Sequence, residues 1–286
     1  MSTLQAVTPE LRQWIVEQAR AGCRPEDVLA SMRASGWQED VAIAALEHTL
    51  QQFLANQPVA GAPLLPPAVP VPEPALAESP SRLWAHDREV TVLLAMRSPR
   101  VVVFGGFLSD EECDALVADA APRMARSETV VNATGGNEVN AARTSQGMFF
   151  GRAETALCAR IEARIAALLH WPVENGEGLQ ILHYRPGAEY KPHHDYFDPA
   201  QPGMGAVLQR GGQRVGTLVM YLNTPAQGGG TTFPDVGLEV APIKGNAVFF
   251  SYDRPHASTR TLHGGAPVLA GDKWVATKWL REGEFH

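Results

Sequence analysis

A dense group of polar side chains occupies the segment YKPHHDY, residues 190–196. If this segment is a strand, its side chains alternate between two faces, so His193 and Asp195 point to one face and His194 to the other. One imidazole and one carboxylate side by side supply two ligands of a metal ion. Two histidines and a carboxylate on one face of a metal, with the opposite positions open, form the ligand set of non-haem iron(II) oxygenases.

The third ligand of such a site must come from another part of the chain. Two histidines further along the sequence, His256 and His263, are the candidates. A zinc hydrolase with the same ligands is the competing interpretation, but no glutamate is placed as a general base in the way that an HExxH helix places it.

The elements that must position these residues are mostly short strands. Apolar runs separated by glycine- and proline-bearing turns predict a β-sandwich or jelly roll that is supported by helices. A capping box of Ser109 and Glu112 predicts a helix through about Ala121, and helical spacing of apolar residues predicts a second helix over 153–169. The expected strands are 101–104, 179–184, 190–196, 215–222, 231–233, 247–252 and 273–280.

The sequence before this region has a different composition. Residues 1–55 carry helical apolar spacing in three short runs and predict a small helical domain. Residues 56–82 are rich in proline, which removes amide donors and fixes φ, so they predict an extended linker. The domain expected to carry the chemistry then spans 83–286.

Composition excludes several classes of protein. The chain of 286 residues has 24 basic and 31 acidic side chains and no basic run, which argues against nucleic-acid binding. Three widely separated cysteines predict neither a disulfide scaffold nor a zinc site. No signal peptide or membrane span is evident, so we expect a cytoplasmic protein with no membrane partner.

One ordered set of motifs resembles a known family. The set contains the HxD pair at 193 and 195, His263, and Lys273 ten residues beyond it. Through these residues the sequence resembles the prolyl 4-hydroxylases, a family of iron(II)- and 2-oxoglutarate-dependent dioxygenases, in its collagen-type and related bacterial and algal members. The resemblance covers about residues 101–281. It includes the segments LSDEEC, ENGEGLQILHYRPGAEYKPHHDYF, GGQRVGTLVMYLN, GGGTTFP, PIKGNAVFF and GDKWVATKW.

The resemblance implies roles for the metal and cosubstrate residues. It implies a double-stranded β-helix (jelly-roll) core after a small all-α N-terminal domain, with His193, Asp195 and His263 as the Fe(II) ligands. His256 is then an ordinary loop residue. Lys273 would pair with the distal carboxylate of 2-oxoglutarate, helped by hydroxyls at Tyr184 and Thr231. Dioxygen is the second cosubstrate, ascorbate is expected as a reductant, and succinate and CO2 are the products.

The resemblance also implies a peptide site. Tyr190, Arg214 and Trp279 match positions that line the pocket for peptidyl-proline, and residues 131–143 match a loop that closes over the peptide. Two departures concern substrate contacts: Arg281 stands where some members have histidine, and residues 148–150 read MFF where an aromatic residue is expected in other members. Lys278, on the opposite strand face from Trp279, is expected to be a solvated charge.

The preferred function is therefore hydroxylation of peptidyl-proline at C4. One alternative is a 2-oxoglutarate dioxygenase that acts on another side chain or on a free amino acid. A second is a catalytically silent sensing or binding module whose helical domain recruits a protein partner. The proline-rich linker itself is a further candidate peptide for the site.

Overall fold

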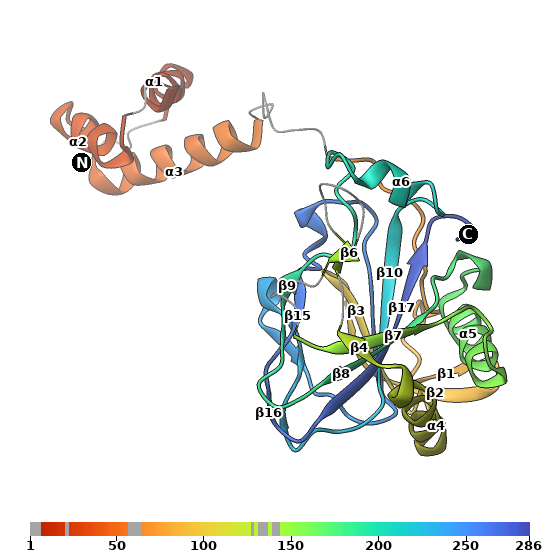
Figure 1. Cartoon of the computed structure of the whole chain (residues 1–286). Coiled ribbons are helices and arrows are strands. Elements are labelled where there is room, and N and C mark those ends of the chain that lie inside the picture. The colour runs from red at the N-terminus through yellow and green to blue at the C-terminus, as the bar shows by residue number, and fades with distance from the viewer. Residues whose placement is uncertain (1–6, 21–22, 57–64, 127–128, 131–136, 139–143) are drawn as a thin grey trace. The chain divides into compact units, whose positions relative to one another are not determined.

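The structure is a computed structural model that describes residues 7–20, 23–56, 65–126, 129–130, 137–138 and 144–286 (Figure 1). The chain divides into two compact units, residues 1–64 and 65–286. None of the helices in the described ranges is both long enough and apolar enough to cross a membrane.

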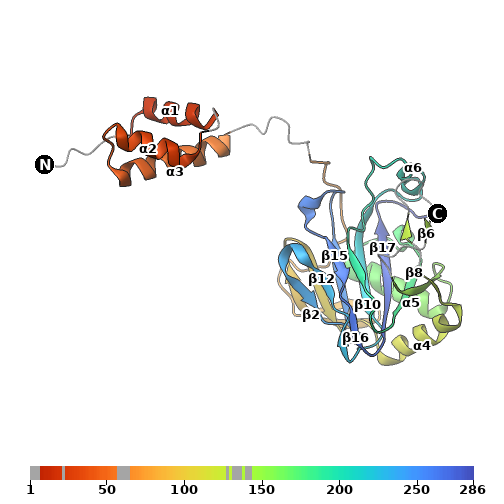
Figure 2. The same ribbon diagram turned by 60° about the vertical axis from the view of Figure 1, so that its left-hand side comes forward.

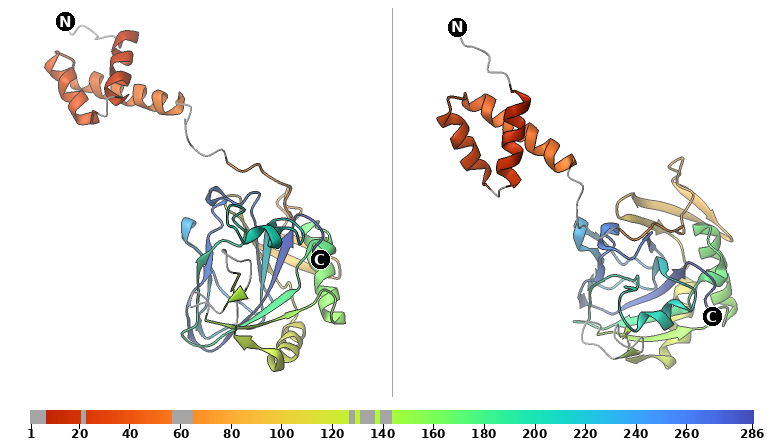
Figure 3. Two further views of the ribbon diagram at one scale, coloured as in Figure 1. Left: turned by 45° about the horizontal axis from the view of Figure 1, so that its top comes forward. Right: turned by 90° about the horizontal axis from the view of Figure 1, so that it is seen from above.

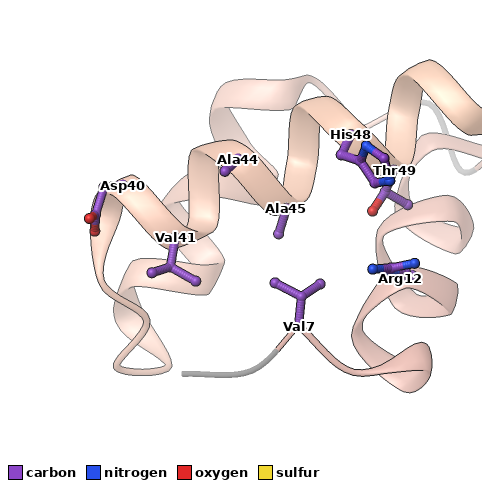
Figure 4. Close-up of a pocket in the computed structure, with 8 residues that line it drawn as sticks. All are labelled: Val7, Arg12, Asp40, Val41, Ala44, Ala45, His48 and Thr49. Carbon is purple, nitrogen blue, oxygen red and sulfur yellow. The ribbon is translucent and has the colours of Figure 1, made fainter. Parts of the chain in front are cut away.

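The first unit contains the three helices that the sequence predicts. They are α1 (Pro9–Arg20), α2 (Pro25–Ala34) and α3 (Glu39–Asn56) (Figure 2). Ile15, Val28, Met32 and Leu46 are buried between them, as their helical spacing requires. The figure of this unit shows a pocket beside α3, toward which Val7 and Arg12 also project (Figure 4).

The described part of the proline-rich segment, residues 65–81, belongs by its contacts to the second unit. It has no helix or strand, as its prolines predict, and runs along the β-rich unit (Figure 3). The Val69 amide donates to the Asp253 carbonyl, Glu73 pairs with Arg100, and Pro72 is buried against Gly216. The boundary between the two units therefore falls inside the segment predicted as a linker.

The second unit is built on two antiparallel sheets (Figure 1). The larger sheet has the order β1-β2-β3-β14-β10-β17-β8-β7-β4, and the smaller sheet has the order β13-β12-β15-β9. Their strands are β1 (Arg82–Ala85), β2 (Arg88–Met96), β3 (Arg100–Gly105), β4 (Ala125–Arg126), β7 (Gln146–Phe150), β8 (Leu179–Tyr184), β9 (Tyr190–His193), β10 (Arg214–Tyr221), β12 (Thr231–Phe233), β13 (Leu238–Val240), β14 (Ala247–Ser251), β15 (His263–Gly265) and β17 (Lys273–Arg281). Two short pairs, β5 (Thr129–Val130) with β6 (Asn137–Glu138) and β11 (Gln227–Gly228) with β16 (Val268–Ala270), lie outside both sheets.

Eight of these strands form the expected jelly roll. The chain passes from β8 in the larger sheet to β9 in the smaller one, and then through β10, β12, β13, β14, β15 and β17. The result is two four-stranded halves, β14-β10-β17-β8 and β13-β12-β15-β9, in which all neighbours except β12 and β13 are distant in sequence. The predicted strands 179–184 and 231–233 have the observed bounds, whereas β9 ends at His193, three residues before the prediction.

Helices cover the outer face of the larger sheet. They are α4 (Asp110–Ala120) and α5 (Ala156–Leu169), and the Ser109–Glu112 capping box predicted for α4 is present. Arg164 of α5 is buried and pairs with Asp87 in the β1–β2 turn and with Glu112 of α4. These two ion pairs join three elements, among them a hairpin that the sequence analysis did not predict.

The expectation for Lys278 was wrong. Its side chain points to the helix-covered face of the larger sheet, where its Nζ donates to Glu162 Oε1 of α5 at 2.6 Å. Both side chains are at most 2% exposed. Strand alternation correctly directs Lys278 away from Trp279, but the face that it reaches is packed against a helix and not open to water.

Candidate active site

The predicted metal ligands converge inside the jelly roll. His193 ends β9 and His263 begins β15, and these two residues are paired directly across the smaller sheet. Asp195 lies two residues beyond β9, with Oδ1 3.5 Å from His193 Nε2 and Oδ2 3.5 Å from His263 Nε2. The ligand atoms of the three residues all lie within 4.8 Å of one another. Strand pairing thus brings together two residues that are 70 positions apart.

Backbone carbonyls orient both imidazoles. The Nδ1 of His193 is 2.9 Å from the Lys191 carbonyl, and the Nδ1 of His263 is 3.0 Å from the Thr261 carbonyl. A carbonyl only accepts, so each Nδ1 carries the proton and each Nε2 keeps its lone pair. The two Nε2 atoms are therefore ready to bind a cation on the side of Asp195.

A hydroxyl pair fixes the carboxylate. Thr217 of β10 donates through Oγ1 to Asp195 Oδ2 at 2.7 Å, and the Tyr252 hydroxyl is 2.9 Å from the same Oγ1. Because a threonine hydroxyl has one proton, Tyr252 must donate to Thr217. Although burial alone would raise the pKa of Asp195, the nearby His263 and His193 hold it far below its usual value.

These ligands fit iron(II). Two neutral imidazole nitrogens and one carboxylate form one side of a coordination sphere, and the opposite side faces a cavity between the sheets. Burial lowers the pKa of His263 to about 4, which keeps this imidazole neutral and able to bind a metal at neutral pH. The cavity is lined by Leu182, Tyr184, Tyr190, His193, Asp195, Thr217, Val219, Thr231, His263, Gly264, Gly265, Lys273, Val275, Thr277 and Trp279.

The remaining histidines near the site have other roles. His256 accepts a hydrogen bond from the Ser258 amide through Nδ1 and caps the short turn 257–259, as expected of a loop residue. His194 does not belong to the ligand cluster and stacks on Tyr196, with ring centroids 4.6 Å apart. The choice of His263 over His256 is therefore supported by position in the fold.

A buried cation lies in the same cavity. Lys273 begins β17 and is 4% exposed, and no described residue accepts a hydrogen bond from its Nζ. Burial lowers its pKa to about 8, with a smaller opposing effect of Glu239. Its Nζ is 5.4 Å from the centroid of the Tyr184 ring. Such a cation is suited to an anionic group that enters the cavity.

The predicted hydroxyls also line this cavity, with one addition. Tyr184 is paired with Lys273 across β8 and β17, and Thr231 lies on β12. The Tyr221 hydroxyl donates to Thr231 Oγ1 at 2.8 Å, which leaves the Thr231 proton available to a ligand. Sequence reasoning missed Tyr221, because strand alternation shows only that it faces the same side as Thr217.

The two aromatic residues predicted for the substrate, Tyr190 and Trp279, both line the cavity. Tyr190 stacks on His193 with ring centroids 3.7 Å apart, and Trp279 is 7% exposed. The Trp279 Nε1 is buried and has no hydrogen-bond partner among the described residues. Phe149 of β7 has its ring 6.4 Å from Trp279 and is 51% exposed. Tyr190 and Trp279 are here called the substrate wall. Phe149, from the MFF segment, extends the Trp279 part of this wall toward the surface.

Arg214 is held in place by a residue that the sequence analysis did not select. Its Nε and Nη2 donate to Glu177 Oε1 and Oε2 at 2.7 and 2.8 Å. Its guanidinium lies 3.9 Å from the centroid of the Trp279 ring. Arg281, the departure from the family pattern, also donates to Glu177. The only available signal was the position of Glu177 inside the matching motif ENGEGLQ. Residues 131–143, predicted as a closing loop, lie outside the described residues apart from the short strand 137–138.

Comparison with known proteins identifies the family. The family model of the 2OG-Fe(II) oxygenase superfamily matches residues 179–281, which include every ligand and the cavity lysine. Prolyl 4-hydroxylase 1 of Arabidopsis thaliana is 40% identical over 225 residues, which cover 70% of this chain and 77% of that protein. Prolyl 4-hydroxylase 5 of the same plant is 41% identical over 209 residues, with 65% of this chain and 70% of the relative covered.

A solved structure is also similar. The viral collagen prolyl hydroxylase of Paramecium Bursaria Chlorella virus-1, in complex with 2OG, has 30% sequence identity and a TM-score of 0.48, with 63% of this chain and 95% of that chain covered. The family model and the curated relatives agree with the ligand geometry. This chain belongs to the prolyl 4-hydroxylase family of iron(II)- and 2-oxoglutarate-dependent dioxygenases.

Proposed function

We propose that this protein hydroxylates peptidyl-proline at C4, with 2-oxoglutarate and dioxygen as cosubstrates. The observation that carries the proposal is the single cavity that contains the triad of His193, Asp195 and His263 together with the buried Lys273 and the indole of Trp279. A metal site, an anion site and an aromatic wall that share one cavity match a reaction in which a dicarboxylate and an apolar ring must meet at a metal.

Different residues would bind the metal ion and 2-oxoglutarate. His193, Asp195 and His263 would hold Fe(II), which supplies the binding and activation of dioxygen when present. Lys273 would bind the distal carboxylate of 2-oxoglutarate, and the hydroxyls of Tyr184 and Thr231, which line the same cavity, would donate to it. The net reaction converts 2-oxoglutarate, O2 and a prolyl residue into succinate, CO2 and a hydroxyprolyl residue.

The substrate wall favours a cyclic apolar side chain. Tyr190 and Trp279 offer flat faces to a pyrrolidine ring, and the fixed Arg214 leaves its Nη1 without a partner among the described residues. This Nη1 is suited to a peptide carbonyl. The buried Trp279 Nε1 is a second donor without a partner among the described residues.

A mass measurement tests the proposal. Incubation with Fe(II), ascorbate, 2-oxoglutarate and proline-rich peptides should add 16 Da to a peptide, and fragmentation should locate the oxygen on proline. A control peptide with alanine at each proline should remain unchanged. If no proline-rich peptide gains mass while 2-oxoglutarate is still consumed, the peptidyl-proline assignment is wrong.

The alternative is action on another side chain or on a free amino acid by the same centre. Substitution of Trp279 by alanine separates the two functions. For a peptidyl-proline substrate, the variant should lose peptide hydroxylation but keep slow succinate formation without peptide, because Lys273 and the metal ligands are unchanged. If hydroxylation of a free amino acid persists in the variant, the alternative is favoured.

Three further expectations are part of the proposal. Ascorbate should sustain turnover by keeping iron reduced, so activity without it should decline over successive turnovers.

The helical unit, residues 7–56, should bind a protein partner. Cross-linking in cells with and without this unit tests that role. A cytoplasmic location agrees with three cysteines that are all free, two of them buried, and fractionation tests it.

A further inference from the structure

A continuous stack of guanidinium groups and aromatic rings connects the substrate wall to the residues that follow β17. Arg214 lies 3.9 Å from the Trp279 ring centroid and 4.8 Å from that of Phe197. Arg281 lies 4.9 Å from the Phe197 centroid and 5.2 Å from that of Phe285. The stack ends with the Arg210 guanidinium, 4.6 Å from the Phe285 centroid. Its members, in order, are Trp279, Arg214, Phe197, Arg281, Phe285 and Arg210.

Two guanidinium groups of this stack share one carboxylate. Glu177 accepts from the Nε atoms of both Arg214 and Arg281 at 2.7 Å, so one carboxylate serves two guanidinium groups. All three side chains are at most 11% exposed. Although burial alone would raise the pKa of Glu177, the two arginines lower it. Glu177 is thus shared between two cations, and the faces of Phe197 and Phe285 add cation–π attraction to them.

Backbone bonds fix residues 282–286, here called the end segment, against residues 207–213. The amides of Glu282 and Gly283 donate to the carbonyls of Gln213 and Gly211, both at 2.9 Å. The Phe285 amide donates to the Glu174 carbonyl at 3.0 Å. Figures 1 and 2 show this end of the chain beside α6 (Met204–Leu208). The Phe285 ring is thus placed by the main chain and not by its own packing alone.

Two glycines permit this close approach. Gly211 and Gly212 have φ values of +103° and +75°, which other residues rarely adopt. A Cβ on Gly211 would lie 3.0 Å from the Glu284 carbonyl oxygen, and one on Gly212 would lie 2.5 Å from a Glu282 carboxylate oxygen. The local backbone is therefore adapted to receive the end segment.

The region that the end segment contacts leads directly to the active site. Residues 196–213 connect the metal ligand Asp195 to Arg214 at the start of β10. Gln213 holds the two ends of this segment together. Its side-chain amide donates to the Phe197 carbonyl and accepts from the Phe197 amide, both at 2.7 Å. A shift of the end segment would be transmitted to Arg281, to Phe197 and then to Arg214.

We propose that Phe285 is a positioning residue, which through Arg281 and Phe197 holds Arg214 against Trp279 and so sets the affinity of the site for its peptide. The inference rests on the proposed function, in which Arg214 and Trp279 contact the peptide. It assigns to the end segment a role in substrate binding, and it requires no direct contact between Phe285 and substrate.

Steady-state kinetics with four variants test the inference. We expect Phe285→Ala to raise the KM for peptide about fivefold, with kcat, the KM for 2-oxoglutarate and peptide-free succinate formation within twofold of the unsubstituted protein. Phe285→Tyr should restore the KM, and Phe285→Leu should resemble alanine, because leucine keeps apolar volume but has no ring. The matched control is His286→Ala, whose side chain is 72% exposed and should have no effect.

Three outcomes would overturn the inference. They are an unchanged peptide KM in Phe285→Ala, an equal rise in both KM values, and full rescue by leucine. An equal rise would indicate a general loss of structure, and rescue by leucine would indicate packing without a cation–π contribution.

A second measurement needs no peptide. The Nε–H signals of Arg214 and Arg281 can be assigned by NMR with Arg214→Lys and Arg281→Lys. Phe285→Ala should shift both signals and speed their exchange with water, whereas His286→Ala should shift neither. An unmoved Arg214 signal would reject the inference. If the unsubstituted protein hydroxylates no peptide, the proposed function fails, and this NMR result still decides whether the end segment positions Arg214.

Discussion

Thr217 Oγ1 donates to Asp195 Oδ2 at 2.7 Å and thereby fixes the one carboxylate among the metal ligands. Both residues are buried, so Thr217 is the group that replaces water at this oxygen. Tyr252 donates to the same hydroxyl and directs its proton toward Asp195. The orientation of the metal ligand is thus set by two residues that do not bind the metal.

Removal of this hydroxyl should weaken metal binding. Thr217→Val keeps the shape of the side chain and should lower the affinity for Fe(II), or for Co(II) as a redox-stable probe, about 10- to 100-fold. Calorimetric titration under argon measures the effect. Thr91→Val, on the exposed face of β2, is the matched control. An unchanged affinity would show that Asp195 is held equally well by the rest of the site.

The two candidate histidines should respond differently to substitution. His263→Ala should abolish stoichiometric Fe(II) binding, because Nε2 of His263 is one of three ligands. His256→Ala should keep the metal site and lose only a small amount of stability with the cap of residues 257–259. Metal titration and thermal unfolding of both variants check this. Loss of the metal site in His256→Ala would contradict the assignment.

The affinity for 2-oxoglutarate should fall at alkaline pH. Burial gives Lys273 a pKa of about 8, and only the protonated amine attracts the distal carboxylate. Well above this pKa the fraction protonated in the free protein drops about tenfold for each pH unit, so the apparent Kd should rise about 50-fold between pH 8 and pH 10. Binding should be nearly constant below pH 7.

A cosubstrate fragment supplies the control for this pH dependence. Binding of 2-oxobutyrate, which has no distal carboxylate, should be weak and should not change between pH 7 and pH 9 through Lys273. An equal alkaline loss for both compounds would assign the titration to another group.

The buried pair Lys278–Glu162 should be costly to break from one side only. Lys278→Met leaves the Glu162 carboxylate buried without its partner and should lower the free energy of unfolding by about 3–5 kcal/mol. The double variant with Glu162→Gln should recover most of this loss, because no uncompensated charge remains. Urea unfolding of the single and double variants measures the difference. A double variant as unstable as Lys278→Met would show that packing, not charge, dominates at this position.

The jelly-roll domain and its metal ligands could be predicted because their signals are local and ordered. Strand runs such as 179–184 and 231–233, the capping box at Ser109 and the HxD pair are each contained in a few adjacent residues. His263 and Lys273 could be added because their spacing matches a family pattern. Prediction failed for Lys278, since the same alternation fits a solvated strand face and one covered by a helix.

The sequence by itself determined which side chains can bind a metal and a dicarboxylate, because the chemistry of imidazole, carboxylate and amine belongs to the residue type. Only the tertiary structure decided which groups surround them. Pairing of β9 with β15 brought His193 to His263, and the approach of β10 placed Thr217 against Asp195. The sharing of Glu177 by Arg214 and Arg281 likewise joins residues from separate parts of the chain. Such contacts depend on sheet order and burial, which no short stretch of sequence specifies.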